Sequence, residues 1–140
     1  MIREITKDTE VLQQISAKVK PDDISTKQLV ADLIDTAMSL GPQSCVGLAA
    51  IQISEPFNVI VVYDGQKYVP YINPVIIKYI GDQYEIEEGC VSLEGTRLVK
   101  RYRGVEIMHQ KGKKFVKEKH YGFYAEILQH ETDHLKGKLI

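Results

Sequence analysis

The chain has 140 residues, of which 44% are hydrophobic and 26% are charged, values that fit one globular domain with a single core. Its 18 basic and 19 acidic residues leave a net charge of -1, so no overall field would gather DNA or an anionic membrane. The N-terminus lacks the apolar centre of a signal peptide, and every apolar stretch is too short to cross a bilayer. We therefore expect one cytoplasmic domain, spanning residues 1–140, that recognises its partner through a local site.

The first half of the sequence predicts a helix followed by a β-hairpin. Between residues 22 and 40, apolar residues recur at steps of three and four, which is the pattern of an amphipathic helix, and Gly41-Pro42 would end it. Residues 58–64 and 67–80 are rich in Val, Ile and Tyr. They flank Asp64-Gly65, a pair that tolerates the positive φ angles of a tight turn.

The second half predicts another hairpin and a final helix. Residues 105–110 and 113–120 would pair across Lys111-Gly112. The pattern becomes helical over residues 122–136, and Gly137 follows in the position of a left-handed cap. This order of elements indicates an α+β domain, in which small, mainly antiparallel sheets pack around the C-terminal helix.

The strongest local signal is the HExxH sequence of residues 130–134, which lies inside the predicted final helix. Residues four apart return to nearly the same helix face, so His130 and His134 can bind one metal ion. Glu131 can reach a water molecule at that ion without itself being a ligand. The structural alternative is a surface helix that carries two histidines by chance.

A catalytic zinc-type site has three protein ligands and one position for water, so the motif needs a third ligand. None of residues 135–140 is a suitable type, and we therefore expect the ligand to lie upstream. Cys90 is the natural candidate, because the glycine before it lets the backbone approach closely and acidic residues flank its thiol. With only two cysteines in the chain, a disulfide scaffold is not expected and a reducing compartment fits best.

Three segments together resemble the signature motifs of the peptide deformylase family, in the same order and with similar spacing. They are Gly47-Leu48-Ala49-Ala50-Ile51-Gln52, Glu88-Gly89-Cys90-Val91-Ser92, and residues 129–137 with the HExxH sequence. The resemblance implies a metal-dependent hydrolase that removes the formyl group, as formate, from the N-terminal formylmethionine of newly made polypeptides. It also implies one divalent ion held by Cys90, His130 and His134, with Glu131 moving the protons.

By the same resemblance, the side-chain amide of Gln52 and the backbone N–H of Val91 stabilise the negative charge that develops on the formyl oxygen. Taken alone, Gln52 could equally be a polar residue that caps a strand. The resemblance further implies an apolar slot for the methionine side chain beside the metal. The expected substrate-binding residues are Val46, Gly47, Leu48, Ile86, Gly89 and Ile127. Each apolar member could instead be an ordinary core residue.

The ligand set leaves the identity of the metal open, since one thiolate and two imidazoles can hold zinc or ferrous iron. The resemblance points to Fe(II) in the cell, with zinc, nickel or cobalt as alternatives. We expect Glu88 or Asp133 to accept a ring N–H from a ligand histidine, and Arg101 to balance that charge. The five lysines at 111, 113, 114, 117 and 119 make the second hairpin basic. This fits either a solvated surface or a transient contact with ribosomal RNA.

Two rival hypotheses remain at this point. Cys45 stands where the first family motif normally begins with glycine, and it could join Cys90, His130 and His134 in a closed structural metal site. That arrangement would leave no place for water, and the protein would be an inactive deformylase-like protein. An HExxH endopeptidase is the second rival, but it would need an open cleft and a third ligand downstream of the helix.

Overall fold

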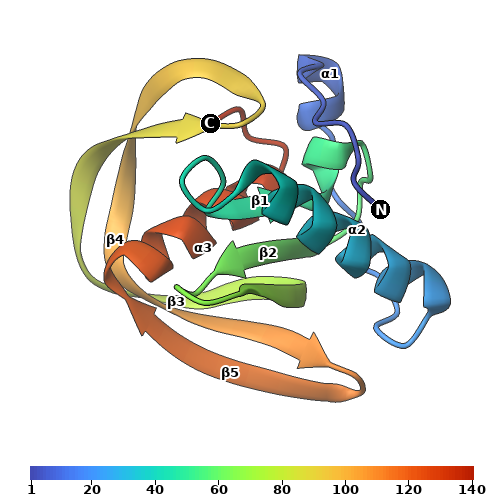
Figure 1. Cartoon of the computed structure of the whole chain (residues 1–140). Helices are drawn as coiled ribbons and strands as arrows, with labels where there is room; N and C mark the ends of the chain where they lie inside the picture. The colour runs from blue at the N-terminus through green and yellow to red at the C-terminus, as the bar shows by residue number, and fades with distance from the viewer.

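The computed structural model describes residues 1–140 as helices packed on one strongly curved sheet (Figure 1). The helices are α1 (Thr9–Leu12), α2 (Ile24–Leu40) and α3 (Gly122–Leu135), with a short 3-10 helix at Ala50–Ile53. The strands are β1 (Gly47–Ala49), β2 (Val59–Tyr63), β3 (Tyr68–Cys90), β4 (Leu93–Lys111) and β5 (Lys114–Tyr121). All neighbouring strands are antiparallel, in the order β1-β2-β3-β4-β5. No helix combines the length and the apolar character that a membrane crossing requires.

Strand β2 shows how the two long helices cover opposite faces of the sheet. Its residues Val59, Ile60, Val61 and Val62 are all fully buried, and successive side chains of a strand point to opposite faces. Ile60 and Val62 pack with apolar residues of α3, whereas Val59 and Val61 pack with apolar residues of α2. A continuous apolar run in this strand is therefore what a sheet buried on both faces requires.

The predicted α+β class is confirmed, and both predicted hairpins form. Tyr63 pairs with Tyr68 across the first turn and Lys111 with Lys114 across the second. The small sheets that we expected are joined into one hydrogen-bonded sheet by β3 and β4, because these strands are longer than predicted. Residues 81–104, which we did not assign to strands, form most of this long hairpin.

The long β3–β4 hairpin curves around α3 (Figure 1). Its register shifts between Ile80 and Gln83, and Gly81 between them has a φ of 79°. Such a bulge bends a strand and increases its twist. The side chain of Gln129 on α3 then fixes the curved strand, since it accepts from the backbone N–H of Tyr102 at 2.8 Å and donates to the carbonyl of the same residue at 3.0 Å.

The end of α3 is held by the segment that follows α1. The backbone N–H of Ser16 donates to the carbonyl of Leu135 at 2.9 Å. Gly137, with a φ of 77°, lies so close to the backbone of Gln13 that a Cβ atom there would overlap its carbonyl group. Position 137 therefore requires glycine for two reasons: its backbone angle is left-handed, and no space remains there for a side chain.

We expect Gly137→Ala to lower the free energy of unfolding by more than Gly95→Ala. Gly95 has a similar φ of 72°, but a Cβ atom at that position would meet no other atom within 4 Å, so its replacement costs only the left-handed strain of about 1–2 kcal/mol. Crowding against Gln13 should add roughly 1–3 kcal/mol at Gly137. Urea unfolding of both variants measures the difference, and equal losses would show that the close approach to Gln13 carries no cost.

Candidate active site

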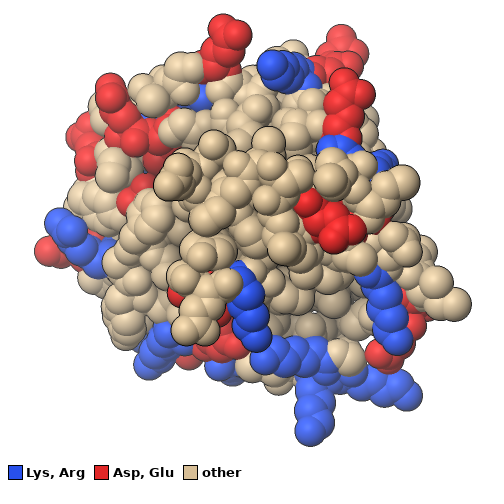
Figure 2. All heavy atoms as spheres, viewed as in Figure 1, with Lys and Arg blue, Asp and Glu red and all other residues tan.

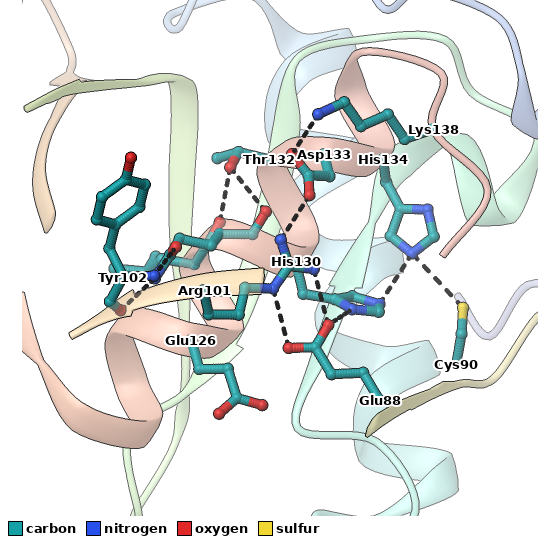
Figure 3. A network of polar contacts seen from close by, with 12 residues as sticks. Glu88, Cys90, Arg101, Tyr102, Glu126, His130, Thr132, Asp133, His134 and Lys138 are labelled. Atoms are coloured by element: carbon teal, nitrogen blue, oxygen red, sulfur yellow. Dashed lines mark hydrogen bonds and ion pairs between the residues drawn. The ribbon is translucent and has the colours of Figure 1, made fainter. Parts of the chain in front are cut away.

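Three side chains that could hold a metal ion, those of Cys90, His130 and His134, converge where the end of β3 meets α3. His134 Nε2 lies 3.2 Å from His130 Nε2 and 3.5 Å from Cys90 Sγ. The ligand atoms of the three residues all lie within 4.8 Å of one another. Figure 3 shows both imidazoles pointing from α3 toward the thiol. Sulfur and imidazole nitrogen are ligands that suit zinc and other divalent transition metals.

The ionisation of the two histidines differs. Burial, followed by the charge of His130, lowers the pKa of His134 to about 3, so this imidazole is neutral and can bind a metal ion. Burial also lowers the pKa of His130, but its hydrogen bonds with Cys90 and Glu88 outweigh burial and raise that pKa to about 10. A cation that binds between these side chains must therefore displace a proton.

A buried ion-pair network orients His130 (Figure 3). Its Nδ1 lies 2.7 Å from Glu88 Oε1, and because a carboxylate only accepts, Nδ1 donates and the ring turns Nε2 toward His134. Arg101 donates to both oxygens of Glu88, at 2.9 and 2.7 Å, and to Asp133 at 2.7 Å. Burial opposes the ionisation of Glu88, but hydrogen bonds from His130 and Arg101 outweigh it and lower its pKa to about 2. Of the two acceptors that we expected for a ligand histidine, the structure has Glu88 in this position, and Asp133 pairs with Arg101.

Glu131 is a buried carboxyl group whose Oε1 has no hydrogen-bond partner in the protein. Burial raises its pKa to about 7, which is near the value that suits a group exchanging protons at neutral pH. Gly47 of β1 packs directly against it. A Cβ atom at position 47 would lie 2.7 Å from Glu131 Oε2 and 2.9 Å from Ile127 Cγ2, so only glycine fits there.

Gln52 is held in one orientation by the backbone before it. Its Oε1 accepts from the N–H of Ala49 at 2.9 Å, and its Nε2 donates toward Cys90 Sγ at 3.3 Å and Ser92 Oγ at 3.2 Å. The side chain is 1% exposed. Its N–H donors are therefore fixed beside the thiol of the ligand group.

These groups border a cleft of about 400 Å³. Of the predicted residues, Val46, Gly47, Gln52, Gly89, Cys90, Val91, Ile127, His130 and Glu131 line it. Leu48, Ile86 and His134 do not. Leu48 is fully buried among apolar residues that include those of α2, because it points to the sheet face opposite to that of Gly47. Ile86 lies just before the lining segment, which begins at Glu87.

The cleft is also lined by residues that the sequence analysis did not single out. They are Ser44, Glu87, Phe123 and Glu126, and they join Cys45 and Glu88, which the sequence analysis had considered for other roles. Phe123 and Glu126 precede Ile127 and His130 by four residues on α3. The helical period alone therefore places them on the face that carries the metal ligand.

Cys45 stands outside the ligand group, although it reaches the same cleft. Its thiol donates to the carbonyl of Gly47, with a distance of 3.2 Å from sulfur to oxygen. Burial, followed by the charge of Glu131, raises the pKa of this thiol to about 12, so it stays protonated at neutral pH. The cluster of close ligand atoms comprises Cys90, His130 and His134 and does not include Cys45, so the structure does not form the closed four-ligand site.

A family model described as polypeptide deformylase matches residues 2–140. The chain belongs to the peptide deformylase family. It is 41% identical over 142 residues to the peptide deformylase of Clostridium beijerinckii, with all of both chains covered. It is 36% identical over 143 residues to that of Dictyoglomus turgidum, covering all of this chain and 91% of the relative.

Solved peptide deformylases share the fold. An actinonin-bound class I type b enzyme from Acinetobacter baumannii superposes with a TM-score of 0.88 at 28% identity, covering 99% of this chain and 95% of that one. The enzyme from Thermotoga maritima gives 0.88 at 29% identity with the same coverage. Another structure of the Acinetobacter baumannii enzyme is bound to Met-Ala-Ser and superposes with a TM-score of 0.87 at 27% identity, covering 99% of this chain and 97% of that one. The family and the enzyme class expected from the sequence, a metal-dependent hydrolase, are confirmed.

We expect Cys45→Ala to keep its metal and Cys90→Ala to lose it. After loading with zinc and desalting, the parent and Cys45→Ala should each retain about one ion per chain, because the three ligands are intact. Elemental analysis measures the content, and thermal unfolding confirms that both variants are folded. Loss of zinc from Cys45→Ala would instead support the closed structural site.

Proposed function

We propose that this chain removes the formyl group from the N-terminal formylmethionine of nascent polypeptides, using Cys90, His130 and His134 as metal ligands and Glu131 as the proton-transfer group. The observation that carries the proposal is the buried Glu131 oxygen without a protein partner, in the same cleft as the ligand group. A buried polar atom left unpaired is costly. The best explanation for the unpaired oxygen is a hydrogen-bond partner that binds in the cleft for the reaction.

The donor set fits one divalent ion, since the three ligand atoms are close together and the neutral His134 is ready to bind. When bound, such an ion supplies Lewis-acid chemistry toward water and toward the formyl oxygen. The backing of His130 by Glu88 would hold that ligand in place. The hydrogen bond at Nδ1 would thus strengthen metal binding at Nε2 of the same ring.

Glu131 would take a proton from the water whose oxygen attacks the formyl carbon. When the bond from that carbon to the amide nitrogen breaks, Glu131 would deliver the proton to the leaving amine. The products are formate and a free N-terminal amine. A pKa of about 7 for this carboxyl supports both directions of transfer. The contact with Gly47 would keep the carboxyl from turning out of the cleft.

Gln52 and Val91 would stabilise the negative charge on the formyl oxygen. The support for Gln52 is its fixed amide, which directs N–H donors to the cleft beside Cys90. Val91 lines the same cleft, in the turn between β3 and β4, and we assign its backbone N–H as the second donor. Donors that are already oriented need no rearrangement as charge develops.

The substrate's first side chain would lie between the β1 segment and α3, against Val46, Gly47, Gly89 and Ile127. The sheet begins with β1 as its edge strand, so one side of this backbone is available to pair with an extended peptide. The Met-Ala-Ser complex of the Acinetobacter baumannii enzyme supports a short peptide in this cleft. Recognition through backbone pairing gives affinity without reading later side chains.

We expect the zinc-loaded or iron-loaded protein to release formate from formyl-Met-Ala-Ser, and Glu131→Gln to reduce kcat/KM by about 10²–10⁴. Removal of the Gln52 donor by Gln52→Leu should cost about 10²–10³ in kcat. Metal content should stay unchanged in Glu131→Gln, because Glu131 is not a ligand. Glu85→Gln, an exposed change on β3 outside the cleft, is the control. A parent protein that carries metal but releases no formate would refute the proposal, and cleavage of unformylated peptides would favour an endopeptidase.

We propose Fe(II) as the metal in the cell, with zinc, nickel and cobalt as ions that the same ligands accept. Anaerobic purification should yield iron at about one ion per chain. Activity should fall on exposure to air, because a ferrous ion is oxidisable whereas zinc has no redox chemistry. Elemental analysis before and after exposure measures this, with the zinc-loaded protein as the air-stable control. Zinc in the anaerobic preparation, with activity indifferent to air, would contradict it.

The cytoplasm is the compartment that this proposal requires, since nascent formylated chains and reduced thiols occur there together. We assign a transient ribosome contact to the basic hairpin of β4 and β5. Figure 2 shows lysines gathered along the edge of the molecule formed by this hairpin. The residues are Lys111, Lys113, Lys114, Lys117 and Lys119, and none of them makes a salt bridge. Unpaired lysines of this kind can meet RNA phosphates.

A further inference from the structure

Glu126 is a buried acid that the proposed mechanism does not use. It lies on the face of α3 that borders the cleft, one helical turn before the ligand His130 and beside Ile127. The residue is only 8% exposed. Acidic side chains are seldom buried without a specific partner. Its place in the cleft wall therefore needs an explanation.

Tyr84 of β3 provides one partner. Its hydroxyl donates to Glu126 Oε1 at 2.9 Å, which fixes the carboxyl group against the β3–β4 hairpin. The other oxygen, Oε2, makes no hydrogen bond to a protein donor, yet it is not among the polar atoms sealed from solvent. Figure 3 shows the carboxyl group of Glu126 on the same side of α3 as Glu88. Glu88 also lies within hydrogen-bonding reach of this carboxyl group, but Glu88 makes no donation to Oε2, so a lone pair of this oxygen remains available at the surface of the cleft.

The surroundings of the carboxyl group disfavour its negative charge. Burial raises the pKa of Glu126 and a side-chain hydrogen bond with Glu88 raises it further, while the hydrogen bond from Tyr84 lowers it. The group thus keeps its proton more readily than an ordinary glutamate. A lysine ammonium gains less from such a carboxyl than from a full negative charge. An amide or hydroxyl, in contrast, can both donate to it and accept from it.

The cleft wall is consequently polar at a point where a pocket for methionine would be expected to be apolar. A thioether cannot donate a hydrogen bond, so a methionine side chain leaves the free acceptor unpaired. A side chain of similar length that ends in an N–H group satisfies it. Sites that present a polar group discriminate strongly between substrates that pair with it and those that do not.

We propose that Glu126 is a specificity-determining residue that extends the substrate range from formylmethionine to formylated peptides whose first side chain is unbranched and ends in a neutral hydrogen-bond donor. Glutamine is the closest match, because its side chain has nearly the length and shape of methionine. The proposal rests on the proposed deformylase function and adds a second class of substrate to it. Tyr84 acts as the positioning residue that holds the carboxyl group.

The test compares kcat/KM for formyl-Met-Ala-Ser, formyl-norleucine-Ala-Ser and formyl-Gln-Ala-Ser in the metal-loaded protein. Glu126→Leu should raise the preference for Met over Gln by about tenfold, the effect of one lost hydrogen bond in a desolvated site. The preference for Met over norleucine should not change, because neither side chain donates. Glu126→Met is the second apolar variant, for use if the leucine variant does not fold.

Two controls separate specificity from a structural effect. Glu126→Gln keeps an acceptor at the same place and should hold the Met-to-Gln ratio close to that of the parent, whereas Glu85→Gln removes an exposed acid outside the cleft and should leave all three rates unchanged. An unchanged Met-to-Gln ratio in a folded, active Glu126→Leu or Glu126→Met variant would overturn this inference alone. Absence of formate from formyl-Met-Ala-Ser in the parent would instead overturn the proposed function.

Discussion

The contact between Glu88 and His130 is the interaction on which the site depends. It joins the long β3–β4 hairpin to α3 at 2.7 Å, and Arg101 reinforces it from β4 through the same carboxylate. Cys90 follows Glu88 by two residues, across a register shift at Gly89, and it lies 3.5 Å from His134 on the same helix that Glu88 contacts. Docking Glu88 onto His130 therefore also delivers the thiol to the two imidazoles. One hydrogen-bonded ion pair sets the position of all three ligand atoms.

The charges around this contact favour a cation. Glu88, Glu131 and Asp133 surround the ligand group, while Arg101 is the cationic side chain buried among them. Removing charges from water is expensive unless opposite charges compensate them. In the protein alone, a proton on His130 supplies part of this compensation, and burial raises the pKa of Glu131 to about 7, so this carboxyl carries only part of a negative charge at neutral pH. A divalent ion would satisfy the same excess of negative charge, which is a physical reason for the sequence to keep these acids buried.

The sequence predicts those elements whose signals are local. The final helix, both short hairpins and the pairing of His130 with His134 on one helix face follow from periodicity, from glycine at Gly65 and Gly112, and from the HExxH spacing. The extension of β3 and β4 over residues 81–104 was missed, because many of its side chains are charged and exposed. Its strands exist through pairing with each other and through the contacts of Glu88 and Arg101 with α3. A short stretch of sequence gives no signal of such long-range stabilisation.

Assignments within the cleft had a similar limit. Gly47 and Leu48 were both predicted to face the substrate, but neighbours in a strand point to opposite faces, and Leu48 belongs to the α2 side of the core. Glu126 was missed because a methionine pocket was expected to be apolar. The helical spacing from His130 places it correctly, so the chemical expectation and not the geometry was at fault.

The curved β3–β4 hairpin also has a consequence for dynamics. Its far end is attached to the rest of the protein by polar side chains and by Val91 and Leu93, which are only partly buried against the core around α2, α3 and β2. Segments with few buried apolar contacts open at a lower free energy than the global unfolding of a protein. The hairpin end can therefore detach as a cooperative unit and carry Cys90 away from the histidines while the core stays folded. Metal exchange would then be governed by this local opening and not by the overall stability of the chain.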